Sequence, residues 1–291
     1  MAISHRLHSP MDVRPDDKLE ETPKKIVFLS VEGETEKDYF THIHNYRQAL
    51  GIETIVHIET LSKLTRDGKS DPNQVFELLQ EFLKIRSEGI LPQDVYDVLN
   101  DDTVNYSLEY ISKYLNGELS DKDAQKLQYA IKMAGIDLDY QKFLSEYKGE
   151  DNNDVFAVVI DRDSGSHSEK TLKELFKKCS SKNCYCFITN PCFEFWLLLH
   201  ISDVINEYDG RFDELKKNNK ISSRHTFVSK EVSEKARHRK DISENIFKKH
   251  YLPNVDLAIE RVSDFKQNEE ELLNSLGSNL PKLFSLLRNK M

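Results

Sequence analysis

The stretch Val155-Phe-Ala-Val-Val-Ile-Asp-Arg-Asp163 joins an unbroken apolar run to two carboxylates that follow it directly. Continuous apolar runs of this length are typical of parallel strands that are covered on both faces of a sheet. A second run, Lys25-Ile-Val-Phe-Leu-Ser-Val31, has the same character and is followed by Glu32-Gly33. The two runs therefore predict two buried strands, each with acidic residues at its carboxyl end.

Working outward from these runs, the remaining pattern alternates strands with helices. The expected elements are a helix from Glu36 to about Ala49 capped by Thr35, a strand over 52–58, a helix over 73–87, a helix over 168–179, a strand over 185–189, and a helix opened by Asn190-Pro191 with the proline in its first position. Such alternation predicts an α/β fold with a mostly parallel sheet flanked by helices.

The chain is expected to divide into three parts. Residues 1–23 are polar and interrupted by prolines, which favours a flexible arm. Residues 24–210 form the α/β core, with a helical insertion at about 91–150, and residues 211–291 form a basic and then helical extension packed on that core. Because the arm has no signal-peptide pattern and no apolar run is long enough to span a bilayer, we expect a cytoplasmic protein without a membrane partner.

Acidic residues stand at the ends of two predicted strands. Ligands of parallel sheets bind at the carboxyl ends of the strands, so Glu32, Asp161 and Asp163 are expected to meet at one edge. Carboxylates are suitable ligands for Mg²⁺ or Mn²⁺, which can position and activate water for attack on a phosphodiester. Turn-forming or solvated acidic residues at strand ends are the alternative interpretation.

Three blocks of the sequence resemble the RloB-like family. They are Val31-Glu-Gly-Glu-Thr-Glu-Lys-Asp-Tyr-Phe40, Ile160-Asp-Arg-Asp163 and Thr189-Asn-Pro-Cys-Phe-Glu-Phe-Trp-Leu-Leu-Leu-His200. That family is similar to the TOPRIM proteins, which include topoisomerases, primases and overcoming-lysogenization-defect nucleases. The segment from Asn279 to Leu287 matches the family only loosely.

The resemblance implies a TOPRIM-like fold that binds Mg²⁺. It implies a metal-binding set of Glu32, Asp161 and Asp163, and marks Glu36 and Glu194 as further residues of the catalytic set. It also implies a role in bacterial anti-phage defence beside a partner ATPase of the ABC type. For Glu36 and Glu194, a charge that complements the start of a helix is an equally strong explanation.

The charge of the chain is unevenly distributed. The net charge is −9, yet residues 211–250 hold twelve Lys/Arg against six Asp/Glu. Phosphate contacts need such cations, and the candidates for nucleic-acid binding are Lys230, Lys235, Arg237, Arg239 and Lys240. A solvated helix face is the alternative interpretation of this segment.

Four cysteines and one histidine are of residue types that bind metals or act in catalysis, but we favour structural roles for them. Cys179, Cys184, Cys186 and Cys192 match no standard zinc spacing, so buried thiols in a reducing compartment are favoured over a metal cluster. His200 lies on the presumed core face of its helix, and a hydrogen-bonded core histidine is favoured over a catalytic one.

These observations leave two main functions in competition. The first is a Mg²⁺-dependent nuclease acting on DNA or RNA, with Glu36 or Glu194 as a possible base. The second is a non-catalytic assembly or sensing subunit of an ATPase complex. Nucleotidyl transfer, which uses the same metal chemistry, is a weaker third possibility.

Overall fold

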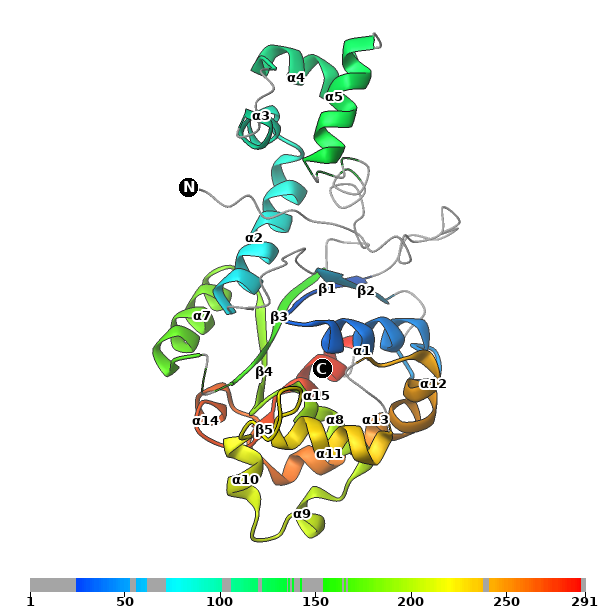
Figure 1. Ribbon diagram of the computed structural model, residues 1–291, viewed down its shortest axis with the longest axis vertical. Coiled ribbons are helices and arrows are strands. Elements are labelled where there is room, and N and C mark those ends of the chain that lie inside the picture. Colours follow the sequence, from blue (N-terminus) through cyan, green and yellow to red (C-terminus); the bar gives the residue numbers. More distant parts are fainter. Residues whose placement is uncertain are drawn as a thin grey trace. The chain divides into compact units, whose positions relative to one another are not determined.

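The two apolar runs form adjacent parallel strands. In the computed structural model, β1 (Lys25–Val31) pairs in parallel with β3 (Val155–Asp161), and Val31 lies opposite Val159. On its other side β3 pairs in parallel with β4 (Tyr185–Asn190), and Asp161 lies opposite Thr189. The predicted α/β fold, with a mostly parallel sheet flanked by helices, is confirmed (Figure 1).

The structure describes residues 25–52, 56–61, 72–100, 106–119, 122–134, 154–163, 167–237 and 241–288, together with residues 136, 138, 142 and 165. The predicted arm over residues 1–23 lies outside them. The chain divides into two compact units, one made of residues 1–21, 61–68 and 77–148 and the other of residues 22–60, 69–76 and 149–291.

Two further strands, β2 and the short β5, complete the sheet, whose order is β2-β1-β3-β4-β5. β2 spans Val56–Leu61, so it begins later than the predicted strand over 52–58, and residues 53–55 lie outside the described part of the chain. β5 spans Gly277–Ser278 and pairs antiparallel with β4. The sequence pattern did not predict β5.

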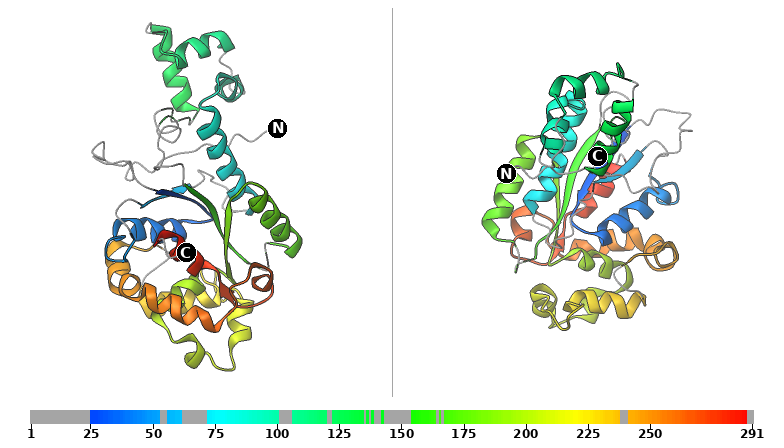
Figure 2. Two further views of the ribbon diagram at one scale, coloured as in Figure 1. Left: turned by 180° about the vertical axis from the view of Figure 1, so that it is seen from behind. Right: turned by 45° about the horizontal axis from the view of Figure 1, so that its top comes forward.

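Both faces of the parallel strands are buried, as their apolar runs require. One face carries Val27 and Leu29 against α1 (Glu34–Asn45) and α8 (Phe193–Ile201). The opposite face carries the fully buried Phe28 and Val158. α7 (Glu169–Ser181) lies on the side of the sheet away from α1 (Figures 1 and 2).

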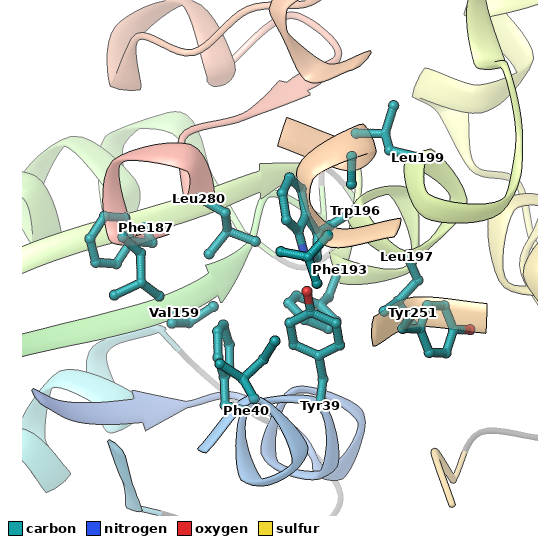
Figure 3. Close-up of a cluster of buried hydrophobic side chains, with 14 of the residues drawn as sticks. Tyr39, Phe40, Val159, Phe187, Phe193, Trp196, Leu197, Leu199, Tyr251 and Leu280 are labelled. Atoms are coloured by element: carbon teal, nitrogen blue, oxygen red, sulfur yellow. The ribbon is translucent and has the colours of Figure 1, made fainter. Parts of the chain in front are cut away.

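The C-terminal region is helical and shares the core of the sheet. Its helices are α9 (Val204–Glu207), α10 (Phe212–Lys217), α11 (Phe227–Ala236), α12 (Glu244–Ile246), α13 (Val255–Arg261), α14 (Glu269–Leu272) and α15 (Leu280–Leu287), with a π turn at Phe247–Tyr251 and 3-10 turns at Leu252–Asn254 and Val262–Asp264. Tyr251 and Leu280 from this region meet Tyr39, Phe193 and Trp196 in one apolar cluster (Figure 3).

The described residues of the other unit are mostly helical. Its helices are the larger part of α2 (Pro72–Glu88), α3 (Pro92–Asn100), α4 (Leu108–Leu115) and α5 (Lys122–Met133). Leu99, Ile111 and Leu127 belong to a separate hydrophobic core. The helical character predicted for the insertion is confirmed for these residues.

Two details of helix capping were predicted wrongly. α1 begins at Glu34 with Gly33 as its N-cap, so Thr35 lies inside the helix. α8 begins at Phe193 with Cys192 as its N-cap, so Pro191, which follows a cis peptide bond, precedes the helix. In α8 the first backbone N–H is instead satisfied by the carboxylate of Asp161, a partner that local sequence rules cannot see.

Candidate functional site

Glu32 follows the last residue of β1, and both of its carboxylate oxygens have partners. Oε2 accepts a hydrogen bond from the backbone N–H of Asp161 at 2.9 Å. Oε1 lies 3.2 Å from Nε2 of His167. The side chain is 10% exposed, so the carboxylate points inward, across to the end of β3.

Asp161 is the last residue of β3 and links that strand to a helix. Its Oδ1 accepts the backbone N–H of Phe193 at 2.7 Å, and Phe193 is the first residue of α8. Free N–H groups and the helix dipole make a helix N-terminus favourable for negative charge. The carboxylate is therefore oriented by β3 on one side and by α8 on the other.

Glu36 and Glu194 stand in the first turns of α1 and α8 respectively. Glu36 is buried, at 5% exposure, and its carboxylate lies against Gly33. A Cβ added at Gly33 would come within 2.9 Å of Oε2 of Glu36. A side chain at position 33 would therefore displace this carboxylate from its present position.

These four residues, Glu32, Glu36, Asp161 and Glu194, interact electrostatically and are called the acidic cluster below. Burial raises the pKa of Glu36 to about 8, and the charges of Glu194 and Glu32 act in the same direction. Burial also raises the pKa of Asp161 well above its usual range, reinforced by Glu36, Glu32 and Glu194. Without a cation, full ionisation of the cluster is energetically unfavourable.

Asp163 takes part in the loop that follows β3. Its Oδ1 accepts the backbone N–H of Gly165 at 3.0 Å, and its backbone carbonyl accepts the N–H of His167 at 2.9 Å. The prediction that Asp161 and Asp163 share a side rested on strand alternation, and β3 ends at Asp161. The described contacts of Asp163 shape this loop, and its role as a metal ligand stays a prediction.

Arg162 and His167 are two buried residues at this edge that sequence reasoning missed. Arg162 is 8% exposed and donates from Nε to the carbonyl of Leu273 at 2.6 Å and from Nη1 to the carbonyl of His167 at 2.9 Å. His167 is 6% exposed. Arg162 occupies the variable position between the two aspartates of the Ile160–Asp163 block, and His167 lies outside all three blocks, so no sequence signal singled them out.

The predicted nucleic-acid residues lie on and after α11. Lys230 pairs with Glu234 at 3.5 Å, and Lys235 forms an ion pair with Glu207. Arg237 is exposed at the end of α11, with a left-handed backbone conformation at φ 53°. Arg239 and Lys240 lie outside the described residues. Contact with nucleic acid stays a prediction for all five.

The predicted burial of the four cysteines and of His200 is confirmed. All four cysteines are buried and free of disulfides. His200 is 1% exposed, contacts the hydroxyl of Tyr39 at 3.0 Å and the carbonyl of Trp196 at 2.9 Å, and has a pKa lowered to about 3 by burial. It is a hydrogen-bonded core histidine.

The chemistry of the acidic cluster suits a hard divalent cation. Its donors are carboxylate oxygens, which Mg²⁺ prefers, and Mg²⁺ retains several waters, so a few carboxylates are enough to hold it. Within the described ranges, no three or more His, Cys, Asp or Glu residues are grouped so that they could hold a metal ion as they stand. The cluster therefore supplies suitable donors, but its side chains would have to move closer together to coordinate an ion.

A mostly parallel sheet with clustered carboxylates at the carboxyl ends of β1 and β3 defines the class: an α/β protein with an acidic strand-end site. The family model described as RloB-like protein matches residues 27–287, and the chain belongs to this family. No curated protein matches the chain, and no solved structure does either. None of the helices in the described ranges is long and apolar enough to cross a membrane.

Proposed function

We propose that this protein is a Mg²⁺- or Mn²⁺-dependent nuclease of the TOPRIM type that hydrolyses phosphodiester bonds in DNA or RNA. The observation that carries the proposal is the crowding of four carboxyl groups, in which burial and the neighbouring charges raise the pKa of Glu36 and of Asp161. A divalent cation would relieve this repulsion and would attract an anionic substrate to an otherwise repulsive surface.

Glu32 and Asp161 are the residues proposed to hold the cation, with Asp163 in the adjoining loop. When bound, the cation would supply charge neutralisation and an acidic water ligand. The backbone N–H of Phe193 keeps Asp161 oriented, and the N–H of Asp161 does the same for Glu32. The carboxylates would thus be held in place before the cation arrives, apart from the smaller movements needed to close around it.

Glu36 is the residue best suited to accept a proton from an attacking water. A general base works best when its pKa lies near the working pH, and the pKa of Glu36 is raised to about 8, mainly by burial. Glu194, which faces the same cluster, is the other candidate. Cations of the segment 211–250, among them Arg237, are proposed to contact the phosphate backbone.

The test is a cleavage assay on the full chain with single- and double-stranded DNA and with RNA, in Mg²⁺ or Mn²⁺. The variants E32Q and D161N keep the size of each side chain but remove its charge. The control is E214Q, which alters an exposed carboxylate on α10 paired with Arg211. We expect cleavage by the wild type and by E214Q, with a loss of at least about 100-fold in E32Q and D161N. Equal cleavage by all four proteins would reject the assigned residues.

One observation favours a second function. In the described part of the chain no finished metal site is present, and both oxygens of Glu32 already have protein partners. A non-catalytic subunit that assembles with an ABC-type ATPase in anti-phage defence, the partnership implied by the family resemblance, would need no such site. Co-purification with such an ATPase, together with uncut nucleic acid after long incubation, would favour this function over the nuclease.

A further inference from the structure

His167 is a buried imidazole of the site that the proposed chemistry does not use. It precedes Ser168, whose side chain caps α7 by accepting the N–H of Thr171. Its Nε2 lies 3.2 Å from Oε1 of Glu32, and the two side chains are 5% and 10% exposed. A contact this well shielded from water has a stronger effect on the orientation of its partners than the same contact at the surface.

The chemistry of the pair defines the direction of its hydrogen bond. A carboxylate that holds a cation is ionised and can only accept, so in the cation-bound state Nε2 of His167 carries the proton and donates a hydrogen bond to Oε1. The second oxygen of Glu32 accepts the backbone N–H of Asp161. With a donor at each oxygen, rotation of the carboxylate about its terminal bond is restrained.

The backbone of His167 is held by Arg162 and Asp163, the two residues that follow β3. Its N–H donates to the carbonyl of Asp163 at 2.9 Å, and its own carbonyl accepts from Nη1 of Arg162 at 2.9 Å. The imidazole therefore starts from the end of β3 and reaches the glutamate at the end of β1. The contact thereby connects the residue that follows β1 with the segment that follows β3, although the two lie far apart in the sequence.

We propose that His167 is a positioning residue that orients the Glu32 carboxylate for a divalent cation. The proposal rests on the assignment of Glu32 as a metal ligand in the proposed function. Groups that hydrogen-bond to a ligating side chain commonly change metal affinity 10- to 100-fold when they are removed. His167 acts through Glu32 in this arrangement, and it does not need to touch the cation or the substrate.

The experiment compares two substitutions that fill similar space. H167Q keeps an N–H donor on its amide, whereas H167M has none. Mn²⁺ affinity of the metal-free full chain is measured by electron paramagnetic resonance, with thermal unfolding as a check of the fold. We expect Mn²⁺ to bind H167M about 10- to 100-fold more weakly than the wild type, and H167Q to recover most of the difference. H225M, which alters a histidine in the loop before α11, is the control and should bind as the wild type does.

A double-mutant cycle with E32Q separates positioning from a general loss of structure. If His167 acts through Glu32, H167M should cause little further loss of Mn²⁺ affinity once E32Q is present. Equal affinity of H167M and the wild type, equal weakening in H167M and H167Q, or full additivity with E32Q would each overturn the proposal. Should H167M fail to fold, H167N, whose amide is too short to reach Oε1, replaces it in the same comparison.

Failure of this inference can be told apart from failure of the proposed function. A wild-type chain that binds no Mn²⁺ removes the premise that Glu32 is a metal ligand, and both ideas then fall. A wild type that binds Mn²⁺ through Glu32, but equally well without the imidazole, leaves the proposed function in place and removes only the role of His167.

Discussion

In two regions of the same sheet, the buried polar groups are arranged in opposite ways. At the carboxyl ends of β1 and β3, the acidic cluster brings together groups that repel one another. At the other edge, called the closing edge here, Asn190, Ser278 and Asn279 join β4 to β5 and are at most 4% exposed. Both regions are buried and polar, but the acidic cluster brings like charges together, whereas the closing edge pairs neutral donors with neutral acceptors.

At the closing edge, asparagine side chains form hydrogen bonds with the backbone and so extend the hydrogen bonding of the sheet. Oδ1 of Asn279 accepts the N–H of Ile188 at 2.7 Å, and its Nδ2 donates to the carbonyl of Cys186 at 3.0 Å. Nδ2 of Asn190 donates to the carbonyl of Leu272 at 2.6 Å. A buried polar group costs little when its hydrogen bonds are made, so this edge can stabilise the strand that precedes α8.

The contrast teaches where this fold places its unfavourable interactions. Proteins tolerate local conflicts mainly at functional sites and compensate for them elsewhere. Here the repulsion lies among carboxylates at the strand ends, whereas the polar side chains of the closing edge form hydrogen bonds with the backbone. Breaking the closing edge should therefore cost stability, whereas neutralising the acidic cluster should add to it.

The largest effect is expected at Gly277. Its φ is +150°, and a Cβ would come within 1.9 Å of the carbonyl oxygen of Lys266, so the backbone would have to move. We expect G277A to lower the free energy of unfolding by more than about 4 kcal/mol or to prevent folding. Urea unfolding checks this, with G210A as the control because that glycine has φ +71° and open space around it. Similar small losses in both variants would contradict the steric argument.

The next effect is expected at Asn279. N279A would leave the buried N–H of Ile188 and the buried carbonyl of Cys186 without these partners. A loss of about 3 kcal/mol in the free energy of unfolding is expected, because each unsatisfied group costs about 1–3 kcal/mol. N274A, at an exposed position in the same segment, should change stability by less than about 0.5 kcal/mol. Equal losses would show that the closing edge has no special role.

The acidic cluster should make stability depend on pH in the metal-free protein. Glu36 has a folded-state pKa of about 8 against an ordinary value of 4.5, so the folded state binds more protons between these values. Stability should therefore fall as pH rises, by about 2 kcal/mol between pH 6.5 and 8, and Asp161 acts in the same direction. E36Q should flatten this slope.

The window above pH 6.5 is chosen because of His200. Its pKa is lowered from 6.5 to about 3, chiefly by burial. The contribution of His200 to stability is therefore opposite in sign to that of Glu36: it rises with pH, and only between those two values. Urea unfolding with a chelator present measures the slope. If the free energy of unfolding of the wild type changes between pH 6.5 and 8 as little as that of E36Q, burial and repulsion do not raise the pKa of Glu36.

The smallest effect is the stabilisation expected from the cation. At pH 8, with the Mg²⁺ concentration at ten times its dissociation constant, the ion should raise the free energy of unfolding by about 1.4 kcal/mol. D161N should lose most of this gain, because it removes a proposed ligand. Thermal unfolding with and without Mg²⁺ provides the measurement, and an equal gain in wild type and D161N would place the cation elsewhere.

The parts of this structure that were predictable from sequence are those with a local signal. β1, β3 and β4 come from apolar runs whose composition alone indicates burial, and Glu32 and Asp161 follow directly from where those runs end. Glu36 and Glu194 could be marked only by family resemblance. Their crowding depends on two helix starts brought together by the fold, which no local pattern encodes.

The parts that were not predictable depend on partners distant in sequence. The capping of α8 uses Asp161, which lies 32 residues before Phe193. β5 has only two residues, too few for any hydrophobic period to show. His167 and Arg162 lie between polar residues of a loop, and their importance comes from burial against Glu32 and Leu273.

The closing edge also bears on how the protein is made. Asn279 holds the backbone of β4, and β4 leads into the helix whose first N–H orients Asp161. During synthesis the N-terminal parts of a chain emerge first, so β1, β3 and β4 leave the ribosome before β5 exists. A nascent or prematurely terminated chain therefore lacks the anchor of this strand, and the orientation of Asp161 depends on a part of the chain that is made almost last.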